Sequence, residues 1–214
     1  MCLFRSVADK TPKTGTEVRN ICPMAPGGKD WQPSSFSPRT GLLYIPHENM
    51  CMDEEGIEPN YIAGTPYIGA SERYYPGPGG NMGELMAWDP IAGKKVWTIQ
   101  DKYPIWSGTV TTAGDLVFFG TLDGWFKAAD ARNGKILWQF KTGSGIIGQP
   151  ISYRGPDGKQ YIAVLSGVGG WPGSIVAGNL DTRDDTAANG WGSALHDLKS
   201  VTQAGGTLYV FSLP

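Results

Sequence analysis

The chain has 214 residues, of which 18 are Lys or Arg and 20 are Asp or Glu, so its formal net charge is −2. This balance lacks the basic excess of nucleic-acid-binding proteins, and we expect no nucleic-acid partner. No run of about 18 apolar residues occurs, which predicts that no segment crosses a membrane as a helix. The 31 glycines and 16 prolines favour short strands and turns over long helices.

Residues 1–29 are expected to form a lead-in segment ahead of the repeats described next. The chain has three cysteines, Cys2, Cys22 and Cys51, and this odd count allows at most one intrachain disulfide. Two interpretations are open: buried free thiols, or a bridge between Cys22 and Cys51 formed in an oxidising compartment. The cysteines show no zinc-binding spacing.

A sequence repeat begins at Gly83 with "GELMAWDPIAGKKVWTIQ" and returns at Gly124 with "GWFKAADARNGKILWQFK". Each copy reads as a short alternating strand, an Asp-containing turn that ends in Gly, and a second strand that contains Trp. Such turns suit a tight hairpin, because Asp accepts local backbone hydrogen bonds and Gly adopts positive φ. Trp97 and Trp138 are 41 residues apart, and a third copy, "GGTLYVFSLP", starts at Gly206.

Two further strands precede each copy, with turns at 38–41, 113–115 and 155–158. The unit is therefore four short antiparallel strands in about 40 residues, which is typical of a β-propeller blade. We predict an all-β fold with a partial propeller over 30–214, made of blades at about 30–100, 103–141 and 146–214. The first and third blades carry insertions near 52–82 and 168–205, and the last blade lacks its fourth strand.

Three blades leave both end faces of the stack uncovered, because each blade buries its faces between two neighbours. We therefore expect the chain to be a C-terminal fragment of a larger propeller, with the remaining blades as its partners. Unpaired strand edges also recruit other chains, which predicts that this chain forms homo-oligomers. The repeated Trp97 and Trp138 are expected to stack between blades, with each indole N–H donating to a carbonyl of the neighbouring blade.

Function is expected from residues that the repeat does not require and that lie near the ends of inner strands. Asp30 and Trp31 precede the first strand of blade one, and Trp106 precedes that of blade two. In the last blade, "GVGGWPG" (167–173) combines glycines, which allow close backbone approach, with the flat Trp171. These groups suit a planar aromatic ligand on the ring axis; alternatively, they only fill a narrow channel.

An acidic stretch, "HENMCMDEEG" (47–56), follows the second strand of blade one. Its carboxylates could bind a hard cation, but their spacing matches no EF-hand loop. We therefore expect a solvated acidic loop. No nucleophile–base pair, P-loop or GxSxG motif is present.

Several motifs together resemble one family. "CPMAPGGKDWQPSSFSPRTGLLYIP", "NMCMD", "AGTPYIGA", "PIWSGTV", "GVGGWPG" and "GGTLYVFSLP" are similar to the C-terminal third of the pyrroloquinoline-quinone (PQQ)-dependent alcohol dehydrogenases. The resemblance covers 15–214 and is strongest to the large subunit of the lanthanide-dependent methanol dehydrogenase branch. It implies an eight-bladed periplasmic propeller that holds PQQ on its axis.

The resemblance also implies a chemistry and a set of residues. A primary alcohol, methanol in particular, would be oxidised to the aldehyde with PQQ, a lanthanide or calcium ion as Lewis acid, and a c-type cytochrome as electron acceptor. Trp106, Gly170 and Trp171 match cofactor-contacting segments. Asp30 stands where calcium-type members carry Asn, which agrees with the lanthanide branch. Cys22 and Cys51 match a family disulfide.

The family's catalytic Asp and metal ligands have no counterpart in this sequence. No catalytic residue and no metal ligand is therefore assigned to the chain, and we expect it to be inactive in isolation. The alternative hypothesis is a non-catalytic propeller built from quinoprotein-like repeats that serves as a protein-binding scaffold. Asp30, Trp106 and the Gly170–Trp171 pair favour the enzyme, because a scaffold has no need of them at the axis.

Overall fold

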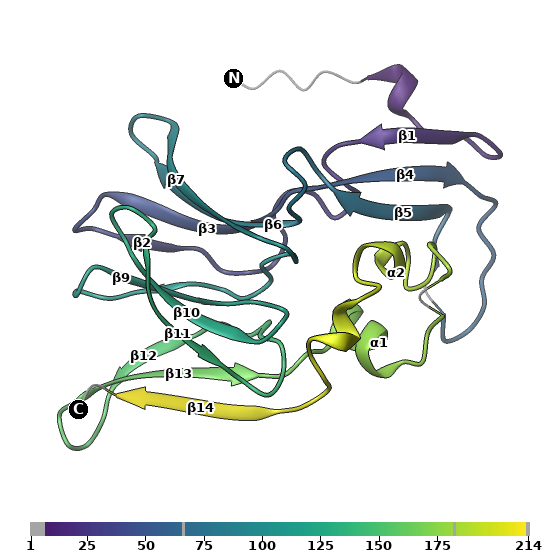
Figure 1. Cartoon of the computed structure of the whole chain (residues 1–214). Coiled ribbons are helices and arrows are strands. Elements are labelled where there is room, and N and C mark those ends of the chain that lie inside the picture. The colour runs from purple at the N-terminus through teal and green to yellow at the C-terminus, as the bar shows by residue number, and fades with distance from the viewer. Residues whose placement is uncertain (1–6, 66, 182, 213–214) are drawn as a thin grey trace.

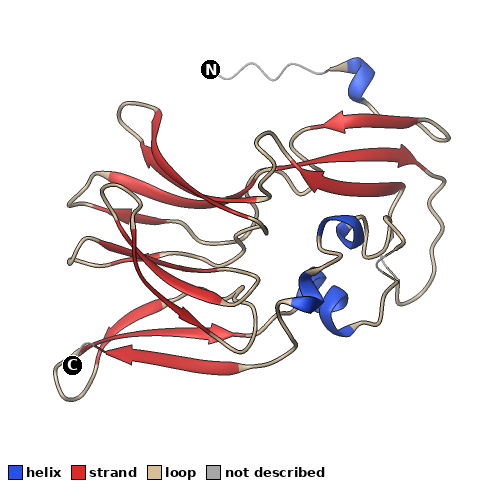
Figure 2. Ribbon diagram, viewed as in Figure 1, coloured by secondary structure: helices blue, strands red, loops and turns tan. Residues whose placement is uncertain are grey.

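The computed structural model describes residues 7–65, 67–181 and 183–212, and almost all of its regular structure is antiparallel sheet (Figures 1 and 2). The first sheet has the order β2-β3-β6-β7, and the second has the order β11-β10-β9-β8. The third has the order β12-β13-β14, and a side sheet has the order β1-β4-β5. Figure 1 shows the first three sheets stacked one above another, with the side sheet and the helices beside the stack.

The strands of the stack follow the chain closely. Those of the first sheet are β2 (Ser35–Ser37), β3 (Leu42–Glu48), β6 (Gly83–Asp89) and β7 (Lys94–Asp101). Those of the second are β8 (Val110–Thr111), β9 (Leu116–Gly120), β10 (Trp125–Asp130) and β11 (Ile136–Lys141). Those of the third are β12 (Ile151–Arg154), β13 (Gln160–Ser166) and β14 (Thr207–Ser212). The predicted propeller-type fold is confirmed.

The repeated turns form as their residues predict. In the β6–β7 turn, the Asp89 carboxylate accepts the N–H groups of Ile91 and Ala92, each at 2.9 Å, and Gly93 adopts φ +62°. In the β10–β11 turn, Asp130 accepts the N–H of Arg132 at 2.8 Å, and Gly134 adopts φ +75°. These positive φ values are why both turns end in glycine.

The stack is held by two apolar layers, because alternate residues of each strand face opposite neighbours. One layer between the first and second sheets contains Leu42, Tyr44, Leu85, Ala87, Ile105, Val117, Phe119, Ala129 and Ala131. A second layer between the second and third sheets contains Phe118, Phe126, Ala128, Ile146, Ile162 and Val164. Both faces of the second sheet are therefore covered along its strands β9 and β10, whereas β11 stays largely exposed.

The two tryptophans of the repeat dock neighbouring sheets. The indole N–H of Trp97 donates to the carbonyl of Ala131 in the next sheet at 3.2 Å, and its ring lies 5.7 Å from that of Tyr44. This confirms the predicted docking for Trp97. Trp138 packs edge-on against Phe211 of the third sheet, with ring centroids 5.1 Å apart, and 39% of its surface is exposed.

The two expected insertions carry structure of their own. The first supplies β4 (Met50–Gly56) and β5 (Ala70–Pro76), which pair with β1 (Glu17–Ile21) from the lead-in segment to make the side sheet. The second supplies α1 (Gly170–Ala177), α2 (Trp191–Ala194) and the 3-10 helix η2 (Leu198–Ser200); another, η1 (Ala8–Lys10), precedes β1. An apolar cluster that includes Tyr74, Ile175 and Trp191 joins the helices to the side sheet.

Candidate functional site

Three loops that lead into the inner strands β2, β8 and β12 lie side by side at one end of the stack. The N–H of Thr109 donates to the carbonyl of Pro33 at 3.0 Å, which joins the first loop to the second. The hydroxyl of Ser107 donates to the carbonyl of Gly148 at 3.1 Å, which joins the second loop to the third. The fold therefore gathers residues 28–34, 105–109 and 146–150 into one region.

Trp106 lies in the second of these loops and is 6% exposed. Its indole packs edge-on against Trp191 of α2, with ring centroids 4.8 Å apart. Its indole N–H donates to the Oε1 atom of Glu48, the last residue of β3. Trp106 is thus held by an edge-on contact with an apolar neighbour and, at its nitrogen, by a buried carboxyl group.

Glu48 is a site residue that the sequence reasoning missed. The prediction of a solvated acidic loop over 47–56 is wrong, because these residues belong to β3, β4 and the one-residue connection between them. Glu48 is only 3% exposed, and its Oε2 atom is buried without a hydrogen-bond partner. The alternation of β3 gave the signal: Leu42, Tyr44 and Pro46 are buried at every second position, and Glu48 continues that series.

The surroundings of Glu48 change its acidity. Burial raises the pKa of Glu48 to about 7, since the charged carboxylate loses its hydration. The Trp106 N–H and the Lys29 ammonium act in the opposite direction, while the negative charge of Asp30 raises this pKa further. A pKa of about 7 places the titration of this carboxyl group near neutral pH, next to Trp106.

Asp30 is exposed in the loop before β2, and its charge reaches Glu48. The same loop is tied to β3 by the N–H of Glu48, which donates to the carbonyl of Gly28 at 2.8 Å. The structure therefore places Asp30, Glu48 and Trp106 in one neighbourhood. In the described part of the chain, the hydrogen bond of the Trp106 indole goes to Glu48 and not to Asp30.

Gly170 and Trp171 form the first turn of α1 rather than an open glycine-rich loop. Gly170 adopts φ +54°, which favours glycine, and Trp171 is 39% exposed. The first N–H groups of a helix have no partner within it, so this end favours a negatively charged group. Ile175 on the same helix shares an apolar cluster with Trp106, which brings α1 to the Trp106 region.

A disulfide between Cys22 and Cys51 is present, as the resemblance implied. It links the loop before β2, which also carries Asp30, to β4, which begins two residues after Glu48. Cys2 lies outside the described residues. Among the residues that the structure describes, no group of three or more His, Cys, Asp or Glu side chains could hold a metal ion.

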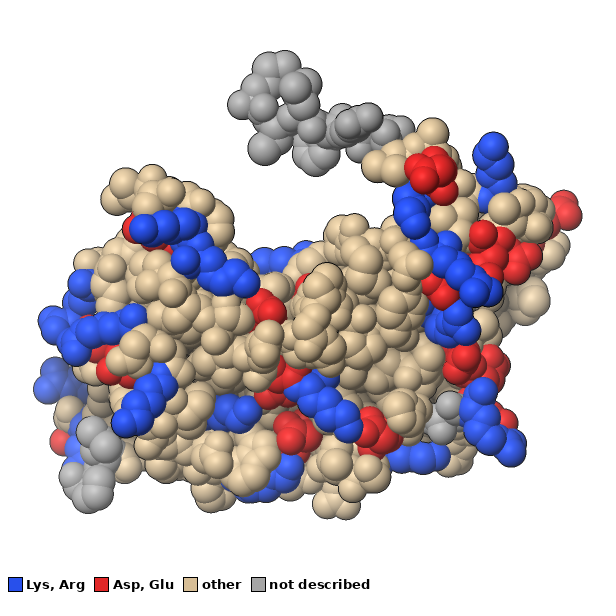
Figure 3. All heavy atoms as spheres, turned by 45° about the horizontal axis from the view of Figure 1, so that its top comes forward, with Lys and Arg blue, Asp and Glu red and all other residues tan. Residues whose placement is uncertain are grey.

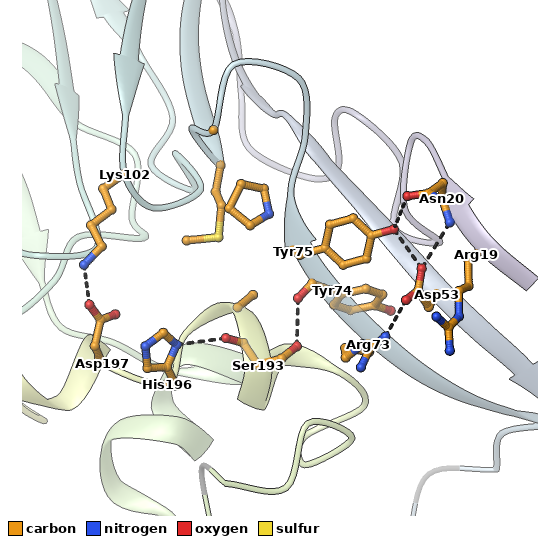
Figure 4. Close-up of a pocket in the computed structure, with 14 residues that line it drawn as sticks. Arg19, Asn20, Asp53, Arg73, Tyr74, Tyr75, Lys102, Ser193, His196 and Asp197 are labelled. Atoms are coloured by element: carbon orange, nitrogen blue, oxygen red, sulfur yellow. Dashed lines mark hydrogen bonds and ion pairs between the residues drawn. The ribbon is translucent and has the colours of Figure 1, made fainter. Parts of the chain in front are cut away.

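A pocket of about 530 Å³ lies elsewhere, between the side sheet and α2 (Figure 4). Four of its charged side chains form two ion pairs: Arg73 with Asp53, and Lys102 with Asp197. None of Asp30, Trp106, Gly170 and Trp171 lines it. The face in Figure 3 likewise carries acidic and basic side chains interspersed. We interpret this pocket as a packing gap between the side sheet and α2, and not as a ligand site.

No helix in the described residues is long and apolar enough to cross a membrane.

Comparison with known proteins agrees with this architecture. The family described as "Glucose/ethanol/alcohol dehydrogenase, beta-propeller domain" matches residues 100–162. A lanthanide-dependent methanol dehydrogenase of Methylacidiphilum fumariolicum is 51% identical over 212 residues, covering 97% of this chain and 35% of that protein. The corresponding enzyme of Methylorubrum extorquens is 48% identical over 209 residues, covering 95% and 34%.

Solved structures show the same relationship. A europium-containing methanol dehydrogenase superposes with a TM-score of 0.91 at 51% identity, covering 97% of this chain and 37% of that one. A quinohemoprotein alcohol dehydrogenase from Comamonas testosteroni superposes with a TM-score of 0.68 at 30% identity, covering 92% and 28%. The chain spans about a third of the length of these relatives. By sequence and by fold, the chain is therefore similar to about a third of these methanol and alcohol dehydrogenases, and its residues 100–162 match the β-propeller family model.

Proposed function

We propose that this chain supplies one wall of the PQQ chamber of an alcohol dehydrogenase. The observation that carries the proposal is the convergence of three inner-strand loops at one end of the stack, with Asp30, Trp106 and the start of α1 in the same region. Functional sites of propellers lie where such loops meet around the central channel. The relatives that match nearly all of this chain are methanol and alcohol dehydrogenases.

The chemistry of the region fits PQQ, which is a planar quinone with three carboxylates. The half-exposed Trp171 offers a flat apolar surface, against which a planar ring system packs well, while the largely buried Trp106 would contribute only the small part of its ring that its neighbours leave uncovered. The amides of Gly170 and Trp171 at the start of α1 suit a carboxylate. Gly170 and Trp171 would therefore hold an acidic edge of the cofactor, Trp106 would border the ring, and Asp30 would accept hydrogen bonds at its rim.

The residues of this chain would position the cofactor and keep water out. Trp106 is backed by the apolar cluster of Tyr74, Ile175 and Trp191, which leaves little room for solvent behind it. Bound PQQ would supply the acceptor for the hydride removed from the alcohol. A lanthanide or calcium ion would serve as Lewis acid, held by residues outside this chain.

The similarity to methanol and alcohol dehydrogenases extends the proposal to the whole protein. Its substrate would be a primary alcohol, methanol in the first place, its electron acceptor a c-type cytochrome, and its compartment the periplasm. Further blades would complete the ring. The outer face of the third sheet supports this, because it carries exposed apolar side chains of the kind that a neighbouring blade covers: Ile151, Tyr153, Leu165, Leu208 and Val210.

Titration of the chain with PQQ, followed by tryptophan fluorescence, tests the proposal. We expect saturable quenching that weakens at least threefold in the Trp106→Phe and Trp171→Phe variants. Trp138→Phe is the matched control, because Trp138 docks two sheets and should leave the binding constant unchanged. Absence of quenching, or equal effects of all three variants, would contradict a quinone chamber and favour a scaffold. Dye-linked methanol oxidation by this chain alone is expected to be absent.

A further inference from the structure

The carboxyl group of Glu48 is buried next to Trp106, and only one of its two oxygens has a hydrogen-bond partner among the described residues. Oε1 accepts the indole N–H of Trp106, whereas Oε2 has no partner among the described residues. Oε2 is also shielded from solvent, so it presents no surface to a ligand in this structure. Whatever Glu48 does for the site, it does through Trp106.

We propose that Glu48 is a positioning residue whose proton state sets how firmly the Trp106 indole is held at the wall of the chamber. The part of this inference that concerns the chamber rests on the proposed function. The coupling between Glu48 and Trp106 does not, because it follows from contacts within this chain.

The charged and titratable groups around Glu48 come from three sides. Lys29 and Asp30 lie in the loop before β2, and Tyr74 lies on β5, where the charge of Glu48 contributes to raising the pKa of its hydroxyl. His47 precedes Glu48 on β3, but its Nε2 atom faces Glu84 at 3.1 Å. Lys29 is therefore the one cation on the described residues whose charge acts on Glu48.

Loss of the proton from Glu48 changes two contacts. The ionised carboxylate accepts the indole N–H more strongly, because a charged acceptor makes a hydrogen bond roughly twice as strong as a neutral one does. It also attracts the ammonium of Lys29, which otherwise donates to the backbone carbonyls of Gln32 and, at 3.2 Å, Asp30. Ionisation should therefore tighten the hold on Trp106 and draw the Asp30 loop toward β3.

The test follows the indole N–H resonances of the ¹⁵N-tryptophan-labelled full chain from pH 5 to pH 9. The Trp106 signal, assigned with Trp106→Phe, should shift with a midpoint within one unit of pH 7. In Glu48→Gln the amide oxygen still accepts the N–H, so the signal should remain but stop titrating. In Glu48→Leu the acceptor is lost, and exchange of this N–H with water should accelerate at least tenfold.

Glu84→Gln is the matched control. Glu84 is also a largely buried carboxylate of the first sheet, but it pairs with His47 and Lys95 rather than with Trp106. This variant should leave the Trp106 titration intact. A Trp106 signal that does not titrate in the unmodified chain, or that titrates equally in Glu48→Gln, would overturn the inference.

Addition of PQQ separates this inference from the proposed function. If Glu48 controls the titration but PQQ leaves the Trp106 and Trp171 signals unmoved, the coupling stands and the quinone chamber fails. If PQQ shifts both signals while Glu48→Gln leaves the titration unchanged, the chamber stands and the role of Glu48 fails. With both correct, the Trp106 midpoint should move by at least half a pH unit when PQQ is bound.

Discussion

Gly134 should tolerate substitution by alanine much less well than Gly93, although the two occupy the same place in the repeated turn. Both have positive φ, +75° and +62° respectively. A Cβ atom on Gly134 would lie 2.7 Å from Cε3 of Trp97, whereas one on Gly93 would meet nothing within 4 Å. The pair therefore separates the conformational cost of alanine from the cost of disturbing the contact between sheets.

The magnitudes follow from these two terms. An L-residue in the left-handed region costs about 1–2 kcal/mol, and this term is common to both variants. Overpacking of a filled contact costs about 1–3 kcal/mol more and applies to Gly134→Ala alone. Trp97 cannot move aside freely, because its indole N–H is bonded to the carbonyl of Ala131 at 3.2 Å. We expect Gly134→Ala to lose about 2 kcal/mol more than Gly93→Ala.

Urea unfolding followed by far-UV circular dichroism measures this difference in unfolding free energy. Thermal unfolding gives a second measure, because in a chain of this length about 2 kcal/mol corresponds to a difference of roughly 4–8 °C between the two melting temperatures. Trp97→Phe combined with Gly134→Ala should recover part of the loss, since the smaller ring leaves room for the methyl group. Equal destabilisation by the two single variants would refute the packing of Gly134 against Trp97 as the reason for glycine at this turn.

Three further predictions concern charge and exposed surface. Burial raises the pKa of Glu48 from 4.5 to about 7, so the folded state holds the proton of this carboxyl group more tightly than the unfolded state does. The resulting contribution to folding stability is fully present below pH 4.5 and is lost as pH rises through about 7. At 1.36 kcal/mol per pKa unit, this loss of stability is at most about 3 kcal/mol. Urea unfolding at pH 5 and at pH 8 should show the loss in the unmodified chain, and Glu48→Gln should abolish this difference between the two pH values. Burial opposes ionisation of Asp53, but Arg73, the N–H of Asn20 at 3.1 Å and the hydroxyl of Tyr75 at 2.8 Å hold its pKa below 3.8. Asp53→Asn should therefore lower the melting temperature at pH 7, and the difference should vanish as pH falls through the pKa of Asp53. Lysine at both Leu165 and Leu208, each 60% exposed on the outer face of the third sheet, should reduce the self-association that light scattering detects in the unmodified chain.

Each of these has an outcome that contradicts it. A Glu48→Gln variant with the same loss of stability between pH 5 and pH 8 as the parent would place the titrating group elsewhere. An Asp53→Asn effect that persists undiminished at pH 2 would show that packing, and not charge, matters at this position. A chain that is monomeric before the lysine substitutions would show that the outer face needs no partner.

The resemblance and the repeat together predicted more of the fold than of the site. The Asp–Gly turns and the 41-residue spacing of Trp97 and Trp138 are local patterns, and the structure confirms the strands that they imply. The pairing of Cys22 with Cys51 came only from the family resemblance, because the count of cysteines left free thiols open. The binding roles of Asp30, Trp106, Gly170 and Trp171 stay predictions, although the structure brings their segments together.

The side sheet shows what local patterns could not supply. Strand β1 lies in the lead-in segment and pairs with β4, so that Val18 faces Glu54 across more than 30 residues of sequence. Nothing in the composition of either segment specifies this partner, because strand pairing is decided by which edges the rest of the fold leaves open. The same holds for α1 and α2, whose packing against Tyr74 depends on the side sheet being there.

The sequence by itself determined the period, the turns and the docking of Trp97 between sheets, because each of these depends on residues that are neighbours along the chain or at a fixed spacing. Only the tertiary structure decided that Glu48 is buried at the Trp106 indole. That contact joins residues 58 positions apart. It arises because the fold closes over a strand end that, read alone, begins an acidic and hydrophilic stretch.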